Sequence, residues 1–249
     1  MEDIAVDARG PVARITLNRP ERKNPLGPRT IAELVDAFGQ LKTDPDVRVV
    51  VVTGAGDTFC AGADLKAVTG TRTATLPELF GAMHELGKPI VAMVNGNALA
   101  GGLGLMVACD LVICADTAKL GTTEIAVGLW PMMITAEITR SIGRKATLDM
   151  MLTGRKLTAA EALGYGLVTR VVPADRLEAE TAALCSELAS RSPVALALGL
   201  HAFYRAQDME YEPQLRYLEG ELARVLATED AAEGIAAFLG RRAPVWKGK

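Results

Sequence analysis

The chain has 249 residues, of which 49% are hydrophobic and 23% are charged. Such a chain can bury a substantial core, which excludes an intrinsically disordered protein and a disulfide-stapled mini-protein. The net charge of −3 provides no large positive field to hold a nucleic-acid backbone. Length alone leaves open whether there is one large domain or two smaller ones.

Cysteine usage and the N-terminal sequence predict a soluble protein of a reducing compartment. The four cysteines form no CxxC pair and have no histidine-rich neighbourhood, so we expect reduced thiols and no zinc site. Residues 1–7 are acidic where a signal peptide would be basic, and the apolar stretches are interrupted by glycine, asparagine or aspartate. We therefore expect a cytoplasmic chain with no nucleic-acid or membrane partner.

The first half of the chain predicts strands that alternate with loops and helices. Residues 12–17 alternate with period two, and residues 31–41 carry apolar side chains at helical spacing. The runs 49–52, 90–94 and 111–115 are continuously apolar, as in strands that are covered on both faces. This order is typical of an α/β layered fold.

Helices are expected to dominate from about residue 135 onward. The segments 75–78 and 158–161 have the pattern of capping boxes, and the first opens a helix that reaches about Leu86. Serine followed by proline at 192–193 predicts another helix start. The helical part is expected to pack on the sheet or on a neighbouring subunit.

Several common catalytic motifs are absent from the sequence. Residues 54–59 begin like a dinucleotide-binding turn but end in Phe59 in place of glycine, and neither GxxxxGK[ST] nor GxSxG occurs. His84 and His201 are the only histidines, and neither stands beside a serine, a cysteine or a second metal ligand. We interpret both as surface or core side chains and expect no metal site.

Two glycine-rich turns, around residues 62–63 and 101–102, each follow a predicted buried strand. The second turn leads into a helix, whose first N–H groups and dipole favour negative charge. A pair of such N–H groups could form an oxyanion hole for a thioester enolate. Tight packing of strand against helix also requires glycine, so the spacing alone supports both interpretations equally.

The sequence resembles the crotonase superfamily, the enoyl-CoA hydratases and isomerases, over nearly its whole length. Single matches are weak, but their number and order make the resemblance specific. The matching segments are residues 17–20, 59–65, 88–89, 94–96, 98–102, 109–110, Gly121 with Glu124, 151–154, 160–162, 166–168, 233–234, 237–239 and Arg242.

The resemblance implies an α/β fold with a spiral core of repeated β-β-α units. It implies a core over residues 1–190 that binds acyl-CoA, and a helical region over residues 191–249 that forms a homotrimer or homohexamer. Coenzyme A would be part of the substrate, with no separate cofactor. Apolar positions in the C-terminal helices also suggest contact surface beyond the needs of one monomer; they include Leu184, Leu188, Leu196, Leu198, Phe203 and Tyr204.

The family's site residues transfer to definite positions in this chain. The two N–H groups of the family's oxyanion hole correspond to Ala63 and Gly101. The family's usual path for CoA lies near Arg22, Lys23, Ala61, Asp64 and Leu65. Arg22 and Lys23 suit phosphate contact by charge, although two exposed cations in a turn are more often simply solvated.

The carboxylates distinguish this chain from the family's hydratases. Hydratases use two glutamates, and the first corresponds to Gly104, where no carboxylate exists. The second corresponds to Glu124, which isomerases of the family use alone to move a proton from C2 to C4. Apolar neighbours at residues 125–133 could raise its pKa. Glu137 is a second candidate carboxylate for the same pocket, although a surface or inter-helix charge is the commoner role.

Three functions follow from these expectations. The first is enoyl-CoA double-bond isomerisation with Glu124 as the single acid and base. The second is enoyl-CoA hydration by Glu124 with or without Glu137. The third is a catalytically weak member that binds acyl-CoA or acts as a scaffold.

Overall fold

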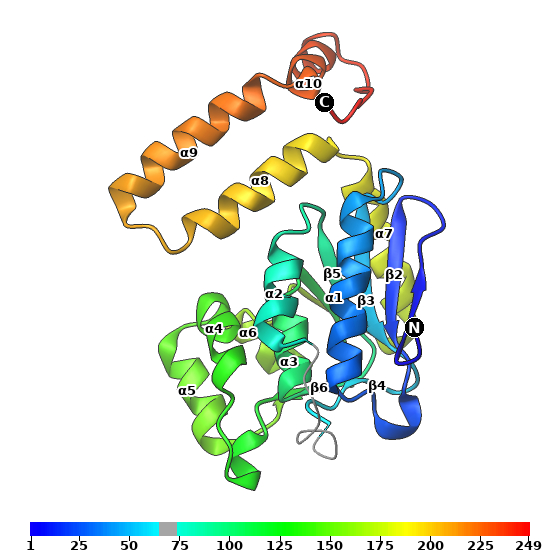
Figure 1. The fold of residues 1–249 in the computed structure, drawn as a ribbon, viewed down its shortest axis with the longest axis vertical. Helices are drawn as coiled ribbons and strands as arrows, with labels where there is room; N and C mark the ends of the chain where they lie inside the picture. Colours follow the sequence, from blue (N-terminus) through cyan, green and yellow to red (C-terminus); the bar gives the residue numbers. More distant parts are fainter. Residues whose placement is uncertain (65–73) are drawn as a thin grey trace.

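A computed structural model describes residues 1–64 and 74–249, and its core contains two sheets (Figure 1). The larger sheet has six strands in the order β1-β2-β3-β5-β7-β10, of which β1 is antiparallel to β2 and the others are parallel. Its strands are β1 (Ile4–Asp7), β2 (Val12–Leu17), β3 (Val49–Gly54), β5 (Ile90–Val94), β7 (Leu111–Ala115) and β10 (Arg170–Val172).

The smaller sheet has the order β4-β6-β8-β9, and only β9 is antiparallel to its neighbour. Its strands are β4 (Thr58–Cys60), β6 (Asn97–Leu99), β8 (Lys119–Gly121) and β9 (Leu157–Thr158). Along the chain, a strand of the large sheet is followed by a strand of the small one and then by a helix, as in β3-β4-α2 and β5-β6-α3. This is the expected core of repeated β-β-α units.

The helices begin close to where the capping signals predict. The side chains of Thr75 and Thr158 accept hydrogen bonds from the third residue of their helices, and Ser192 caps the helix that Pro193 opens. The first of these helices ends at His84, two residues before the expected end. The helices are α1 (Pro28–Thr43), α2 (Leu76–His84), α3 (Gly101–Val107), α4 (Met132–Ser141), α5 (Arg144–Thr153), α6 (Ala159–Tyr165), α7 (Leu177–Ala189), α8 (Pro193–Ala206), α9 (Tyr211–Leu226) and α10 (Glu229–Leu239).

Strand β3 is buried on both faces, as its unbroken run of valines predicts. Val50 and Val52 face the main core, while Val49 and Val51 face a second core that includes Leu184 of α7. Because successive side chains of a strand point to opposite faces, this strand needs apolar residues at every position. Leu184 therefore serves the core under the sheet, and our expectation of an intersubunit role for it is not supported.

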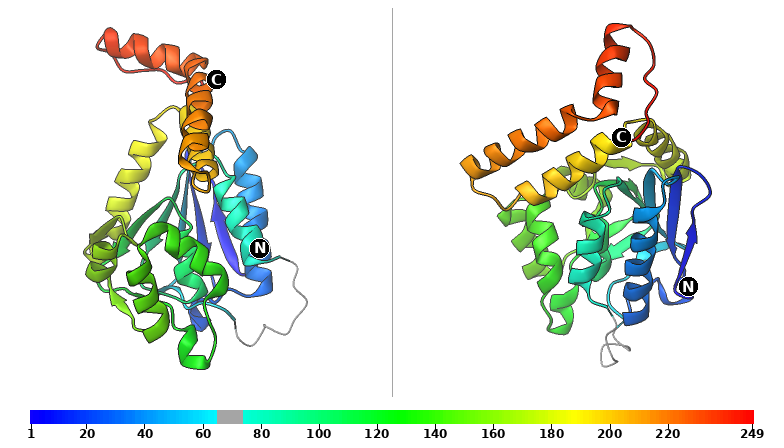
Figure 2. Two further views of the ribbon diagram at one scale, coloured as in Figure 1. Left: turned by 90° about the vertical axis from the view of Figure 1, so that its left-hand side faces the viewer. Right: turned by 45° about the horizontal axis from the view of Figure 1, so that its top comes forward.

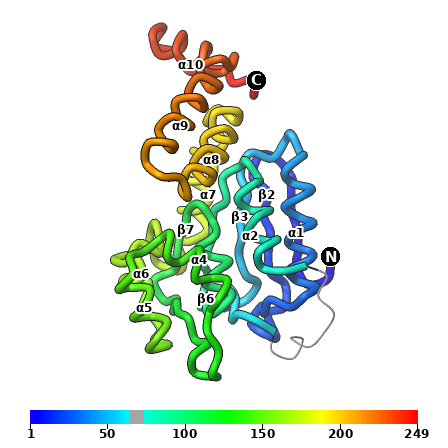
Figure 3. The backbone as a smooth tube through the Cα atoms, turned by 60° about the vertical axis from the view of Figure 1, so that its left-hand side comes forward, coloured from blue at the N-terminus to red at the C-terminus, as the bar shows by residue number. Residues whose placement is uncertain are grey.

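The C-terminal helices α8, α9 and α10 form an arm that extends away from the sheets (Figures 1, 2 and 3). Helix α9 has no buried residue, and four of its exposed leucines repeat at helical spacing: Leu215, Leu218, Leu222 and Leu226. An apolar stripe of this kind is typical of a helix that packs against a partner. Within the described residues, no helix is long and apolar enough to cross a membrane.

The buried Asp230 of α10 connects the end of the chain to the start of α8 through hydrogen bonds. Its carboxylate accepts hydrogen bonds from the Ser192 hydroxyl (2.7 Å) and from the N–H groups of Lys247 (2.7 Å) and Gly248 (3.1 Å). Burial alone would raise the pKa of Asp230, but these hydrogen bonds outweigh burial and lower it. The stabilisation is therefore present at neutral pH and is lost as the pH falls through the lowered pKa.

Replacing Asp230 with alanine is expected to lower the free energy of unfolding by about 2–4 kcal/mol, because the Ser192 hydroxyl and two N–H groups lose their acceptor. Urea unfolding followed by circular dichroism measures this loss. Glu229→Ala is the matched control, since its exposed pair with Lys247 is worth about 0–1 kcal/mol. Equal losses in the two variants would contradict the role assigned to Asp230.

Candidate active site

Three loops that carry predicted site residues begin at the same edge of the small sheet. Ala63 follows β4, Gly101 follows β6 and Glu124 follows β8. These three strands are parallel, so their carboxyl ends lie together, which is where α/β proteins commonly bind ligands. The N–H of Ala100 also donates a hydrogen bond to the carbonyl of Gly121 (2.8 Å), which joins the second loop to the third.

The N–H groups of Ala63 and Gly101 lie close together. Ala63 forms a parallel bridge with Leu26 in which Leu26 and Asp64 donate the hydrogen bonds, so the bridge does not use the N–H of Ala63. A Cβ atom built on Gly101 would lie 3.8 Å from the nitrogen of Ala63. The N–H of Gly101 belongs to the first turn of α3, where helix geometry gives it no partner within the helix.

The backbone around these two N–H groups has an unusual conformation. Gly62 has a φ of 98°, and a Cβ there would lie only 2.7 Å from the Cβ of Ala100. Ala100 itself has a φ of 49°, a strained value for a residue with a side chain. Such strain is often found at functional sites. Gly102, in contrast, is explained by packing, because a Cβ would lie 2.4 Å from the carbonyl oxygen of Cys60.

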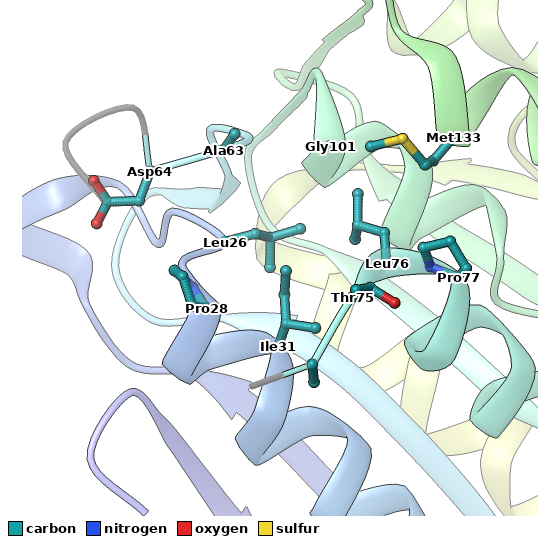
Figure 4. A pocket seen from close by; sticks show the side chains of 11 residues that line it. Leu26, Pro28, Ile31, Ala63, Asp64, Thr75, Leu76, Pro77, Gly101 and Met133 are labelled. Atoms are coloured by element: carbon teal, nitrogen blue, oxygen red, sulfur yellow. The ribbon is translucent and has the colours of Figure 1, made fainter. Parts of the chain in front are cut away.

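A cavity of about 290 Å³ opens beside Ala63 and Gly101. Figure 4 shows the side chains of Leu26, Ile31 and Leu76 converging on it, with Met133 beside Gly101. The lining is mainly apolar, so the cavity suits a hydrocarbon group whose polar end lies at the two N–H groups. Neither Glu124 nor Glu137 is among the described residues that line it.

Glu124 lies in a 3-10 turn (Glu124–Val127) and is half-buried. Its Oε2 atom is buried and has no hydrogen-bond partner in the described part of the chain. Burial raises the pKa of this carboxyl, and nearby backbone N–H groups only partly offset that effect. The raised pKa agrees with the expectation for a proton-transferring carboxylate.

Most of the apolar residues expected around Glu124 are themselves exposed. Of the residues expected to surround Glu124, five are exposed in the monomer: Ile125, Val127, Leu129, Met132 and Met133. Trp130 packs against the main core, and Met133 lines the cavity beside Gly101. Apolar sequence around a residue does not determine which way the side chains point in a turn.

Position 104 has no room for a side chain. A Cβ atom built on Gly104 would lie 2.1 Å from Cγ2 of Ile134, which is buried on α4. At the position that corresponds, by resemblance, to the first glutamate of the hydratases, α4 therefore packs closely against α3. The sequence predicts that a carboxylate is missing there, and the structure identifies Ile134 as the residue that occupies the space.

Glu137, a candidate second carboxylate, is not among the described residues that line the cavity beside Gly101, and the structure agrees with its other interpretation, an inter-helix charge. Because Ile134 packs at Gly104, Glu137 lies one turn further along α4 and lines pockets with Ala136, Val107 and Ala108. Its Oε2 lies 3.4 Å from Nε2 of His84. Glu137 is thus an inter-helix charge that is buried and paired.

The sequence does not predict the polar cluster that surrounds His84. The His84 ring stacks on Tyr204 with centroids 4.2 Å apart, and the Tyr204 hydroxyl donates a hydrogen bond to Asp110. Burial raises the pKa of Tyr204 and, despite that hydrogen bond, of Asp110. These residues come from distant parts of the chain, so no local sequence signal could have revealed the cluster.

The residues expected near CoA are brought together where the structure describes them. The N–H of Ala61 donates to the carbonyl of Lys23 (3.0 Å), and Arg22 donates to a buried Asp64 oxygen (2.9 Å). Arg22 is therefore already paired, while the side chain of Lys23 is exposed. Leu65 lies outside the described residues. In the part of the chain that the structure describes, no three or more histidine, cysteine, aspartate or glutamate side chains are grouped so that they could hold a metal ion.

The two sheets, the β-β-α repeats and the loops at their carboxyl ends define a crotonase-type α/β fold. The family model for enoyl-CoA hydratase/isomerase matches residues 7–249, and the chain belongs to this family of the crotonase superfamily. It is accordingly an enzyme that acts on acyl-CoA thioesters.

Similar proteins cover the chain from end to end. A Mycobacterium tuberculosis protein named probable enoyl-CoA hydratase is 39% identical, over 98% of this chain and 97% of that protein. The 2,3-dehydroadipyl-CoA hydratase of Escherichia coli is 34% identical over all of both chains. A crystal structure of enoyl-CoA hydratase from Mycobacterium smegmatis matches with a TM-score of 0.93 and 33% identity over 99% of each chain.

Proposed function

We propose that this enzyme moves the double bond of 3-enoyl-CoA to the 2,3 position, with Glu124 as the only acid and base. The observation that carries the proposal is the packing at position 104. The chain has glycine there in place of a carboxylate, and Ile134 leaves no room for a side chain. Hydration requires water to be positioned and deprotonated near the substrate, a task that hydratases of this family give to two glutamates. Isomerisation needs only one group to remove and return a proton.

In the proposed reaction, the carboxylate of Glu124 removes a proton from C2, and the electrons of that C–H bond pass to the thioester oxygen. The N–H groups of Ala63 and Gly101 donate hydrogen bonds to the resulting enolate oxygen, and each such donor contributes about 10²- to 10³-fold to the rate. The protonated Glu124 then returns its proton to C4. No atom is gained or lost, and the carboxylate is regenerated.

We infer that the CoA portion lies along the segments 22–23 and 61–64, where Lys23 offers an exposed cation. The pair between Arg22 and the buried Asp64 would fix the shape of this surface. No cofactor other than the CoA of the substrate is required by this proposal.

Hydration is the second candidate, because the similar curated proteins bear hydratase names. Assays of the purified protein with 3-enoyl-CoA and 2-enoyl-CoA separate the two functions. We expect 3-enoyl-CoA to yield 2-enoyl-CoA with little 3-hydroxyacyl-CoA. Formation of 3-hydroxyacyl-CoA as the faster reaction would favour hydration, and binding without turnover of either substrate would indicate a non-catalytic acyl-CoA binder.

We also propose that the protein is a homotrimer or homohexamer assembled through the C-terminal arm. The four exposed leucines of α9 support this, together with Phe238 and Leu239 of α10, which are 83% and 76% exposed. Light scattering at micromolar concentration should give a mass of three or six chains. Leu222→Glu is expected to shift the mass toward the monomer, whereas Glu219→Gln on the same helix should leave it unchanged. A wild-type monomer would contradict the proposal.

A further inference from the structure

A second cavity, of about 300 Å³, continues from the cavity beside Gly101 along the groove between α2 and α4. Pro77 of α2 and Met133 of α4 line both cavities, so they mark the point where one meets the other. From Met133 to Arg140, α4 rises by about 10 Å. An acyl chain that extends past Met133 therefore enters this groove.

The groove is open because its walls carry small residues. Gly81 of α2 and Ala136 of α4 both line it, and a Cβ atom built on Gly81 would have no neighbour within 4 Å. Phe80 lies at its base, 3.5 Å from the position of a Cβ on Gly104.

The far end of the groove is polar, unlike the cavity beside Gly101. His84 is paired with the buried Glu137, and Arg140 donates two hydrogen bonds of 3.0 Å to Asp208. The carboxylates of Glu137 and Asp208 thus each have a nitrogen partner. Asp208 is 72% exposed, so only the His84–Glu137 pair is largely withdrawn from water. A methyl end would cover that pair without hydrogen-bonding to it, and a carboxylate end would compete with Glu137 for His84.

We propose that the groove between α2 and α4 is a subsite for acyl chains that end in a neutral hydrogen-bonding group, such as a hydroxyl. A hydroxyl both donates and accepts, so it adds hydrogen bonds to the His84–Glu137 and Arg140–Asp208 pairs without breaking either one. The inference deepens the proposed function, since it takes acyl-CoA as the ligand and places the thioester at Ala63 and Gly101.

Binding of saturated acyl-CoA tests the subsite without any reaction. Calorimetry compares butyryl-CoA, which is too short to reach the groove, with decanoyl-CoA, ω-hydroxydecanoyl-CoA and the ω-carboxyl analogue. We expect the hydroxyl-ended ligand to bind about tenfold more tightly than decanoyl-CoA, because it gains hydrogen bonds to polar groups that a methyl end would leave unsatisfied. Equal or weaker binding of the hydroxyl-ended ligand would overturn the proposal, as would tighter binding of the ω-carboxyl analogue.

Two variants locate the effect. Gly81→Leu fills the groove and should weaken binding of both decanoyl ligands about tenfold or more, while binding of butyryl-CoA stays unchanged. Gly39→Leu is its matched control, because Gly39 is an exposed helix glycine with open space around it and lies outside the groove. The double variant His84→Phe/Glu137→Leu keeps a ring against Tyr204, leaves no buried carboxylate without a partner, and should reduce the preference for the hydroxyl end while binding of decanoyl-CoA stays unchanged.

If Gly81→Leu and Gly39→Leu weakened binding equally, or if His84→Phe/Glu137→Leu kept the full preference for the hydroxyl end, the proposal would be wrong. Butyryl-CoA binding verifies that each variant is folded. The proposed function fails separately, in the activity assay. In that case the protein would still show these binding preferences but would not isomerise short 3-enoyl-CoA.

Discussion

Replacing Glu124 with glutamine is expected to lower the rate of isomerisation by about 10²- to 10⁴-fold, the usual contribution of a positioned acid or base. Glutamine has nearly the same shape but neither removes nor returns a proton. The KM for 3-enoyl-CoA should change little, because the cavity and the N–H groups of Ala63 and Gly101 remain. Steady-state kinetics on the purified variant measures both quantities.

Glu137→Gln is the matched control for that experiment. Glu137 is also a buried carboxylate, but it is paired with His84 and does not line the cavity beside Gly101 among the described residues. Its loss should leave kcat on short substrates close to that of the wild type. The assignment of Glu124 as the sole acid and base fails if Glu124→Gln retains full activity, or if both variants lose activity equally.

The pH dependence of the reaction provides an independent check on the same carboxyl. Burial raises the pKa of Glu124, and the reaction needs its ionised form to remove the proton from C2. The value of kcat/KM should therefore rise with pH through a pKa above the ordinary value for glutamate of about 4.3. The residual activity of Glu124→Gln should lack this step; an identical step in the variant would assign the titration to another group.

The parts of the fold that depend on local pattern could be predicted from the sequence. The valine run at 49–52 predicts a strand covered on both faces, and the side chains of β3 do divide between two cores. The capping residues of α2, α6 and α8 were equally informative. In each case the information lies within a few neighbouring residues, where backbone geometry determines the structure.

The parts of the site that depend on long-range contacts could not be predicted. The sequence left two roles open for Glu137, a second carboxylate in the pocket of Glu124 or an inter-helix charge, and the packing of Ile134 on Gly104 sets it beside His84. The exposure of Ile125 and Leu129, which follow Glu124, could not be predicted from their apolar character either. Side-chain direction in these turns depends on which helices pack together, and one sequence does not reveal that.

The packing that replaces the missing glutamate leads to the second large expected effect. Gly104→Ala should lower the free energy of unfolding by about 1–3 kcal/mol, the typical cost of an extra methyl group in a well-packed core. The new Cβ would lie 2.1 Å from Cγ2 and 2.8 Å from Cβ of Ile134, and these atoms are not the end of a flexible chain. Urea unfolding of the variant and the wild type measures the difference.

Gly39→Ala is the control for intrinsic helix propensity, because Gly39 is a helix glycine with nothing within 4 Å of its Cβ position. There alanine should be neutral or stabilising by up to about 1 kcal/mol. Ile134→Ala alone should cost about 2–5 kcal/mol, but it makes room for a Cβ at position 104. The double variant Gly104→Ala/Ile134→Ala should therefore lose less stability than the sum of the two single losses. Strict additivity, or a Gly104→Ala loss no larger than that of Gly39→Ala, would mean that α4 can move aside, and that the fold itself does not prevent a second carboxylate at this position.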